Sequence, residues 1–458
     1  MASGQNNNGG SLSFGVEMEF WVFYVTEDQG PVVVPNGMES HPGKPIYIRD
    51  TPHRAYEVEK SLKTRIRDFV QTLPLATVLP PGINTSIADM LNADALHLRH
   101  YRQWNVEDDL TLDHLPPELE AVSGPSSGWV GVEVISPALW ATDDGFDQVR
   151  KVCEFINNNF WTYTHPIAGL HIHVGNGKKY FPNHSLRQIA ALLYAADPIL
   201  AQAHPEHRHN NGFCPSLRLC SKLSLGETAN GAAAPLEQLN APTDSSLFKI
   251  RSFFRSLFGR RPPHPRTRRH AREREMDGFP PRPKKPMFVP NSQRDPADRR
   301  ASPSEAFGIL MGQTSRKQIC TLMTTSILRP AYSFHDSDLT TKRTIEFRRP
   351  ASSVDPAEVV AQARIAVALC EFAANPDEER FHKIILDCDT ADEHPGWYDV
   401  YDLLLDLDLR PEARVVHAAL KGTLNESVRK EYWSSRRFPI ENNSHPYTRN
   451  LVNILPLW

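Results

Sequence analysis

Two pairs of ionisable residues lie at the spacing of neighbours on one face of a β-strand. Glu17 and Glu19 occur in "SFGVEMEF" (13–20), and His171 and His173 occur in "GLHIHVG" (169–175). Successive strand residues point to opposite faces and rise about 3.3 Å each, so the two members of a pair point the same way. Two carboxylates held close together raise one another's pKa, and a bound cation removes that penalty. The glutamate pair alone is compatible with a solvated acidic strand face, and it predicts a cation site only together with further residues.

Two further segments repeat this design. Glu133 lies in "GVEVISP" between Val132 and Val134, and Glu346 and Arg348 alternate with apolar residues in "TIEFRRP". Alone, Glu346 and Arg348 would be read as a surface ion pair. Four such strands side by side in an antiparallel sheet would instead form an acidic face with two imidazoles and a guanidinium. We use the name acidic face for this set, which comprises Glu17, Glu19, Glu133, His171, His173, Glu346 and Arg348.

The residue types of the acidic face favour magnesium chemistry. Carboxylate oxygens suit Mg²⁺ or Mn²⁺, ions that commonly share their ligands with substrate phosphates. A guanidinium adds a planar fork that matches phosphate oxygens. The sequence contains no HExxH motif of a catalytic zinc site and no GxxxxGK[ST] loop, so a bound nucleotide would not use a P-loop.

Hydrophobic periodicity predicts the elements that must position these residues. Strands are expected at 14–24, 129–136 and 169–175, and in a segment that ends at Pro350. Helices are expected at 56–73, 144–159 and 303–313. Two more are expected to begin at caps, one at Ser185 and one at Asp355 with Pro356 in its first turn.

Composition favours a soluble protein over a nucleic-acid or membrane protein. The 458 residues include 51 basic and 54 acidic side chains, which gives no global attraction to polyanions. The N-terminus lacks the pattern of a signal peptide, and no apolar run approaches the roughly 20 residues of a membrane span. The six cysteines form no CxxC pair, so reduced thiols are expected. A cytoplasmic protein is the resulting expectation.

The stretch 225–304 differs in character from the rest of the chain. Residues 249–300 contain sixteen Lys and Arg against five Asp and Glu, with many prolines. This composition predicts a flexible insertion that could contact a polyanion or act as a nuclear-import signal, although aromatic residues are not interleaved as single-stranded nucleic acid requires. The expected organisation is a disordered tail (1–12), a catalytic domain in two parts (13–224 and 305–375) interrupted by this insertion, and a C-terminal helical region (376–458).

Six motifs in order resemble the amidoligase family of the carboxylate-amine ligase superfamily, to which glutamine synthetase and glutamate cysteine ligase belong. The motifs span most of residues 14–370 and are Gly15-x-Glu17-x-Glu19-Phe20, Trp104-x-Val106-x-x-Asp109-x-Thr111, Gly131-Val-Glu133-Val-x-Ser136-Pro137, Gly169-Leu-His171-Ile-His173-Val, Arg208-x-x-Asn211-x-Phe213-Cys214 and Thr344-Ile-Glu346-Phe-Arg348. The resemblance implies an α+β fold with a curved antiparallel sheet flanked by helices, like the catalytic fold of glutamine synthetase. It also implies a reaction in which ATP phosphorylates a carboxylate and an amine attacks the acyl phosphate, with small-molecule or peptide substrates.

The resemblance also implies roles for individual residues. Divalent metals would be bound by Glu17, Glu19, Glu133, His171 and Glu346. His173 would face the ATP phosphates or support the metal site, and Arg348 would stabilise charge on the transferred phosphoryl group. Arg208 and Asn211 would hold a substrate carboxylate or phosphate. Asp109 and Thr111 would lie on the substrate side. The alternative is that these two residues only form a turn before a strand.

Two residues differ from the family motifs, and other functions are compatible with the same sequence. Arg343 stands where the family usually has glycine, and Phe213 replaces a commoner tyrosine. The same residues could serve a metal-dependent amide or phosphate hydrolase, or an inactive scaffold with a basic polyanion-binding loop. Cys214, with histidines nearby, could instead be the nucleophile of a thiol hydrolase.

Overall fold

A computed structural model describes most of the chain outside the N- and C-terminal segments. The described residues are 12–26, 42–49, 51–73, 101–209, 211–227, 266–290, 293–295, 299–325, 329–338 and 342–436. Within them, no helix is both long and apolar enough to cross a membrane.

The chain divides into two compact units. The first comprises Met1–Phe181, Leu339–Val367 and Gly422–Trp458, and the second comprises Pro182–Asp338 and Ala368–Lys421. These limits do not follow the boundaries expected from composition, because the expected segments 13–224 and 376–458 are each shared between the units.

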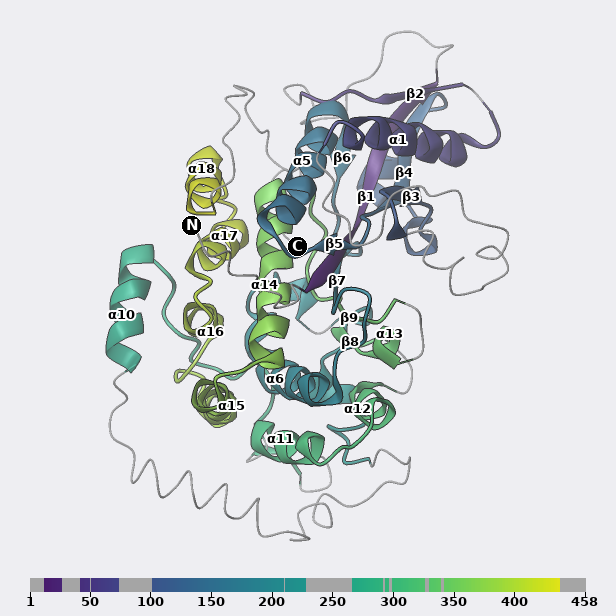
Figure 1. The fold of residues 1–458 in the computed structure, drawn as a ribbon. Coiled ribbons are helices and arrows are strands. Elements are labelled where there is room, and N and C mark those ends of the chain that lie inside the picture. The colour runs from purple at the N-terminus through teal and green to yellow at the C-terminus, as the bar shows by residue number, and fades with distance from the viewer. Residues whose placement is uncertain are drawn as a thin grey trace, which may run out of the picture. The chain divides into compact units, whose positions relative to one another are not determined.

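The strands of the first unit form one open sheet, drawn in purple to green in Figure 1. Its order is β3-β4-β1-β7-β9, and all of these neighbours are antiparallel, which confirms the predicted α+β class. β5 and β6 pair antiparallel with β1, whereas β2 pairs with it in parallel. The strands are β1 (Ser13–Thr26), β2 (Ile46–Ile48), β3 (Asn105–Glu107), β4 (Ser127–Ile135), β5 (Leu139–Trp140), β6 (Thr162–Tyr163), β7 (Leu170–Gly175) and β9 (Thr344–Phe347).

β1 is buried on both of its faces. On one face, Met18 lies against helix α5 (Asp143–Asn159), where the Cys153 Sγ approaches the Met18 Sδ at 3.6 Å. The other face carries Glu17 and Glu19 and continues into Trp21 and Phe23, which belong to a buried aromatic cluster. The same face of one strand thus passes from an acidic half to an aromatic half.

Helices α1 (Arg54–Val70), α4 (Pro117–Glu120), α5 and α18 (Glu426–Ser435) complete the first unit with the start of α14 (Pro356–Ala374). α14 begins as predicted, because the Asp355 Oδ1 accepts hydrogen bonds from the backbone N–H groups of Ala357 at 2.9 Å and Glu358 at 3.1 Å. Such a cap satisfies N–H groups that have no partner inside the helix.

The second unit is mainly helical. It contains α6 (Asn183–Ala201), α7 (Leu217–Cys220), α10 (Arg266–Asp277), α11 (Pro303–Met311), α12 (Arg316–Met323), α13 (His335–Asp338), α15 (Glu378–Glu393), α16 (Val400–Asp406), α17 (Arg410–Leu420), the end of α14 and strand β8 (Tyr332–Ser333). The apolar α6 packs against α7, α11, α12, α15 and α16. The predicted cap of α6 is wrong, because the cap position is three residues earlier, at Pro182, and the Ser185 hydroxyl donates to the Ala374 carbonyl oxygen at 3.1 Å.

Part of the basic stretch is folded, which corrects the expectation of a flexible insertion there. Residues 266–277 form α10, and Arg274 binds both oxygens of Asp399 at 2.6 and 2.8 Å. Beyond the helix, Arg282 makes a second two-point contact with Asp402. Residues 228–265 of the predicted insertion, like the predicted tail 1–11, lie outside the described residues.

Candidate metal centre

The strand register brings the predicted acids and histidines together. β1 pairs with β4 so that Glu19 is opposite Glu133, and with β7 so that Glu17 is opposite His171. β7 pairs with β9 so that His173 is opposite Glu346. The predicted side-by-side arrangement of the four strands is therefore confirmed.

His171 lies at the centre of these side chains. Its Nδ1 is 3.6 Å from the Glu17 Oε2 and 3.8 Å from the Glu346 Oε1, and its Nε2 is 3.4 Å from the Glu19 Oε1. The His173 Nε2 lies 3.2 Å from the Glu17 Oε1. Glu17 and Glu19 are only 7% and 5% exposed, which excludes the alternative of a solvated acidic strand.

Two groups of side chains in the acidic face could each hold a metal ion. One comprises Glu17, His171 and Glu346, and the other comprises Glu19, Glu133 and His171, with the ligand atoms of each group within 4.8 Å of one another. A neutral imidazole offers a single acceptor nitrogen, so His171 can serve one group at a time. The carboxylate-rich donor set fits Mg²⁺ or Mn²⁺, which prefer oxygen ligands.

The carboxyl groups of the acidic face differ in pKa. Burial, followed by the negative charges of Glu17 and Glu19, raises the pKa of Glu133 to about 9. Burial also raises the pKa of Glu19. The pKa of Glu17 is well below its ordinary value, because the neighbouring charges of His173 and Lys342 and hydrogen bonds from both histidines outweigh the effect of burial. Crowded acids of this kind are expected where a cation belongs.

Backbone and hydroxyl groups orient the ligand side chains. The backbone N–H of Gly169 donates to the Glu19 Oε2 at 2.7 Å. The Ser352 hydroxyl donates to the backbone carbonyl oxygen of Glu19 and so contacts the strand, not the carboxylate. On the neighbouring strand, the His173 Nδ1 lies 3.0 Å from the Thr344 Oγ1. Contacts of this kind fix ring and carboxylate orientation in metal sites.

Arg348 lies beside the ligands at the end of β9. Its guanidinium forms an ion pair with Glu346 and keeps 15% of the side chain exposed. Although burial acts in the opposite direction, the charges of His173 and Arg348 lower the pKa of Glu346. A partly exposed guanidinium next to the carboxylates could contact an anionic ligand of the metal.

Lys342 is a site residue that sequence reasoning missed. Its Nζ lies 3.5 Å from the Glu17 Oε1, two residues before β9 begins. The cation-rich dipeptide Lys342-Arg343 was the available signal, but a lysine outside a strand has no periodic position that could assign it to a face. Arg343 itself has a φ of +59°, the left-handed region where glycine fits best, which explains glycine at this place in the related motif.

Asp109 and Thr111 form a turn, as their alternative reading predicted. The Asp109 Oδ1 accepts from the Thr111 backbone N–H at 2.8 Å and caps the short helix η2 (Leu110–Leu112). The Asp109 charge also contributes to the raised pKa values of Glu19 and Glu133, so this residue lies near the acidic face. Its predicted role on the substrate side remains a prediction.

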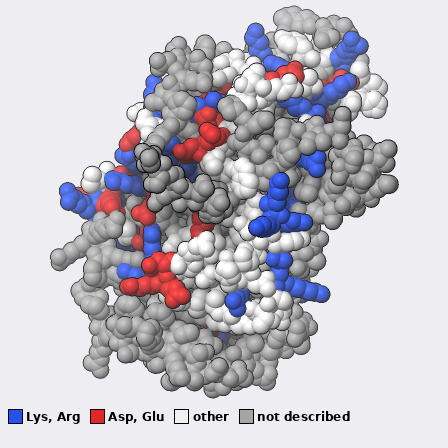
Figure 2. All heavy atoms as spheres, in the orientation of Figure 1, with Lys and Arg blue, Asp and Glu red and all other residues white. Residues whose placement is uncertain are grey.

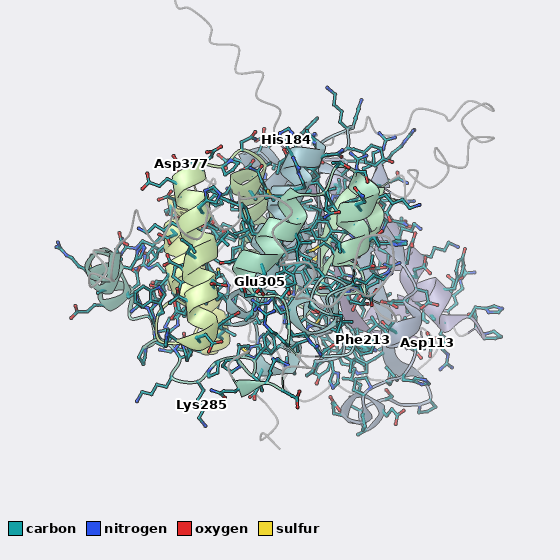
Figure 3. All side chains as sticks on the ribbon, turned by 90° about the horizontal axis from the view of Figure 1, so that it is seen from below. Asp113, His184, Phe213, Lys285, Glu305 and Asp377 are labelled. Atoms are coloured by element: carbon teal, nitrogen blue, oxygen red, sulfur yellow. The ribbon has the colours of Figure 1, made fainter. Side chains whose placement is uncertain are left out.

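Arg208 and Asn211 belong to the second unit, and their predicted contacts with substrate remain predictions. Arg208 is fully buried, and the Asn211 Oδ1 accepts from the Phe213 backbone N–H at 2.6 Å. Phe213, labelled in Figure 3, is 51% exposed. Cys214 is fully buried with its Sγ directed at the Arg208 carbonyl oxygen, an environment unsuited to a nucleophile.

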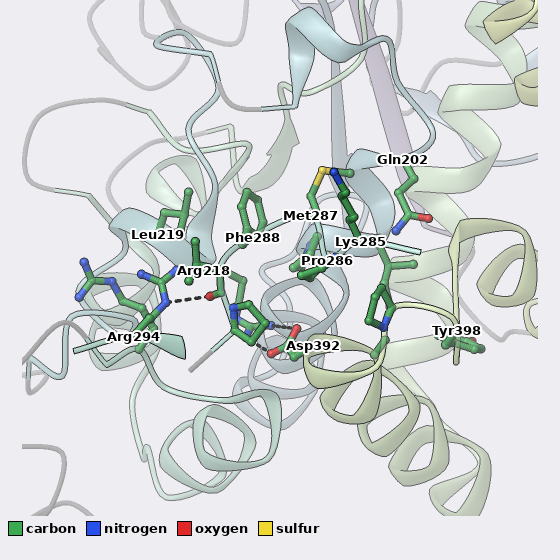
Figure 4. A pocket seen from close by; sticks show the side chains of 17 residues that line it. Gln202, Arg218, Leu219, Lys285, Pro286, Met287, Phe288, Arg294, Asp392 and Tyr398 are labelled. Carbon is green, nitrogen blue, oxygen red and sulfur yellow. Dashed lines mark hydrogen bonds and ion pairs between the residues drawn. The ribbon is translucent and has the colours of Figure 1, made fainter. Parts of the chain in front are cut away.

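The second unit also contains a pocket, which Figure 4 shows at close range. Its walls include Phe288, Met287 and Tyr398, together with Arg218, which forms an ion pair with Asp392. None of the residues predicted for the site lines this pocket. On the molecular face of Figure 2, basic and acidic side chains of the described residues occur in interspersed groups.

Comparison with known proteins agrees with the sequence motifs. The family model described as "Putative amidoligase enzyme" matches residues 11–243, just over half of the 458-residue chain. The match covers β1, β4 and β7 but ends before β9, so Glu346 and Arg348 join the site through the fold. A comparison with curated proteins found no match. The extent of the family match shows that this chain belongs to the amidoligase family.

Proposed function

We propose that the protein is an ATP-dependent carboxylate-amine ligase that works with Mg²⁺ or Mn²⁺ at the acidic face. The observation that carries this proposal is the pair of ligand groups that share His171 beside the guanidinium of Arg348. Metal ligands next to an arginine are the parts that stabilise a transferring phosphoryl group. The family match supports a ligase-type enzyme.

In the proposed reaction, the γ-phosphoryl group of ATP passes to an oxygen of the substrate carboxylate, and ADP leaves. The amine nitrogen then attacks the acyl carbon, releases phosphate and loses a proton, which leaves an amide. When bound, divalent cations reduce the repulsion between the anionic carboxylate and the anionic nucleotide.

Each residue of the site has a proposed task. The metals would be held by Glu17, Glu19, Glu133, His171 and Glu346. Arg348 and His173 would contact the ATP phosphates, and Arg348 would stabilise charge on the moving phosphoryl group. Asp109 and Thr111, in the same unit, would lie on the substrate side.

The test is calorimetric titration of a non-hydrolysable ATP analogue in the presence and absence of Mg²⁺. We expect saturable binding that requires Mg²⁺ and is lost in Glu17→Gln/Glu19→Gln. The matched control is Glu378→Gln/Glu379→Gln, which removes two exposed acids from the first turn of α15 and should bind normally. Absence of nucleotide binding by the folded wild type would contradict the proposal.

Turnover distinguishes the ligase from a hydrolase at the same site. A ligase releases ADP only when a carboxylate and an amine are both present. Metal-dependent cleavage of an amide or phosphate ester without ATP would instead assign the site to hydrolysis.

A further inference from the structure

Lys342 places an ammonium group inside the acidic face. Its Nζ lies 3.5 Å from the Glu17 Oε1, and only 16% of its side chain is exposed. Glu17 belongs to the ligand group that also contains His171 and Glu346. The lysine therefore occupies the neighbourhood in which a divalent cation would bind.

Neighbouring contacts hold the chain in place around Lys342. The Lys342 Nζ lies 4.8 Å from the centre of the Tyr101 ring, a distance at which an aromatic face attracts a cation. The Arg343 guanidinium donates to the Lys178 carbonyl oxygen at 2.7 Å and lies 4.7 Å from the centre of the Tyr180 ring. These contacts anchor the backbone and leave the flexible four-carbon lysine stem as the part that can move.

We propose that Lys342 is a resident cation of the acidic face, which balances Glu17 in the metal-free protein and binds the anionic phosphate chain of the nucleotide once metal is present. The second half of this inference rests on the proposed function. A divalent cation bound at Glu17 repels the ammonium group, whereas an incoming phosphate attracts it. Lysine suits both tasks, because its three donors rotate freely and it is a common phosphate ligand.

The test compares Lys342→Met with wild type in two titrations. In the first, Mn²⁺ alone is titrated into metal-free protein, and we expect Lys342→Met to bind it about tenfold more tightly because a competing positive charge is gone. In the second, a non-hydrolysable ATP analogue is titrated at saturating Mg²⁺. Here we expect Lys342→Met to bind about tenfold more weakly, because a charged hydrogen bond is lost.

Three further variants make the comparison specific. Lys342→Arg keeps the charge and should retain most of the nucleotide affinity, and Lys342→Gln replaces the Met variant if that protein does not fold. Lys179→Met removes an exposed lysine from the turn after β7 and should match wild type in both titrations.

The opposite signs of the two effects separate a direct role from a structural one. If Lys342→Met binds both ligands more weakly by the same factor, or binds both with wild-type affinity, the inference is overturned. If wild type binds Mn²⁺ but no nucleotide analogue, the proposed function fails and with it the phosphate-binding role. In that case the Mn²⁺ titration alone decides whether Lys342 balances Glu17.

Discussion

Glu133 illustrates how a position in the sheet changes the chemistry of a carboxyl group. It faces Glu19 across the β1–β4 pair, and burial together with the charges of Glu17 and Glu19 raises its pKa to about 9. The metal-free protein therefore holds a proton on Glu133 at neutral pH. That proton must leave before the carboxylate can bind a metal, so we infer that metal affinity rises with pH up to about 9.

The same pKa predicts a pH-dependent effect of Glu133→Gln on stability. Between the ordinary carboxyl pKa of 4.5 and about 9, the folded protein binds a proton that the unfolded chain has lost. This difference lowers the free energy of unfolding as pH rises. In EDTA at pH 8 we expect Glu133→Gln to be more stable than wild type by at least about 1 kcal/mol in urea unfolding.

The advantage of Glu133→Gln should shrink as pH falls toward 4, where the wild-type carboxyl group is protonated in the folded state and largely so in the unfolded state. The control is Glu120→Gln, which removes an exposed acid from α4 and should give the same pH profile of stability as wild type. If the free energies of unfolding of wild type and Glu133→Gln change with pH in parallel, the raised pKa of Glu133 is contradicted.

At the scale of elements, strand periodicity predicted the acidic face but not all of its surroundings. Glu17, Glu133, His171 and Glu346 alternate with large apolar residues, and this period of two fixes the face of the sheet on which each lies. Lys342 and Ser352 reach Glu17 and Glu19 from outside the strands. Their contacts depend on loop geometry, which periodicity does not encode.

Of the two helix caps predicted from the sequence, the cap at Asp355 is correct and the cap at Ser185 is wrong. Asp355 caps α14 as expected, whereas the Ser185 hydroxyl lies inside α6 and binds the carbonyl oxygen of Ala374, a residue distant in sequence. A serine followed by an apolar helical pattern can lie at the N-cap or inside the first turns of the helix. In α6, tertiary packing places it inside the helix.

Gly131 shows why β4 requires a residue without a side chain at one point. A Cβ atom built on Gly131 would lie 2.4 Å from the Cβ of Leu112, in the helix η2 that Asp109 caps. We expect Gly131→Ala to cost about 2 kcal/mol in urea unfolding, because Leu112 must shift. Amide exchange of residues 110–112 should become faster.

The control for this prediction is Gly312→Ala at the end of α11. Gly312 has a φ of −74°, and an added Cβ would make only ordinary contacts, the shortest at 3.5 Å. This change should leave stability nearly unaltered. A Gly131→Ala protein as stable as Gly312→Ala would show that the approach of η2 to β4 is not tight.

At the scale of the whole molecule, the prediction of a flexible insertion, made from composition, is wrong for the described residues 266–290. Arg274 and Arg282 lie in a Pro- and Arg-rich segment with no sustained apolar period, which is typical of disorder. Their partners, Asp399 and Asp402, come more than 100 residues later. Ion pairs between residues so far apart cannot be predicted from the local sequence. The division of the chain into two units cannot be predicted from it either.

The ion pairs of α10 predict a measurable loss of order in Arg274→Met. Arg274 is only 7% exposed, and its removal leaves Asp399 without two of its hydrogen bonds. Breaking one partner of a buried pair typically costs about 3 kcal/mol or more. We expect faster amide exchange in α10 and in residues 278–290, measured by mass spectrometry.

Arg272→Met is the matched control, because Arg272 is an exposed residue of the same helix. Its exchange pattern should follow that of wild type. If Arg274→Met and Arg272→Met behave alike, the contacts to α16 do not hold α10 in place.

Binding of divalent metal by the acidic face can be measured by titration of Mn²⁺ into metal-free protein followed by electron paramagnetic resonance. Wild type and Glu378→Gln/Glu379→Gln should remove Mn²⁺ from solution with the same saturable affinity, because the control acids lie on α15. Glu17→Gln/Glu19→Gln should lose this binding while remaining folded, because one ligand is missing from each group that shares His171. Equal Mn²⁺ binding by all three proteins, or none by wild type, would contradict the account.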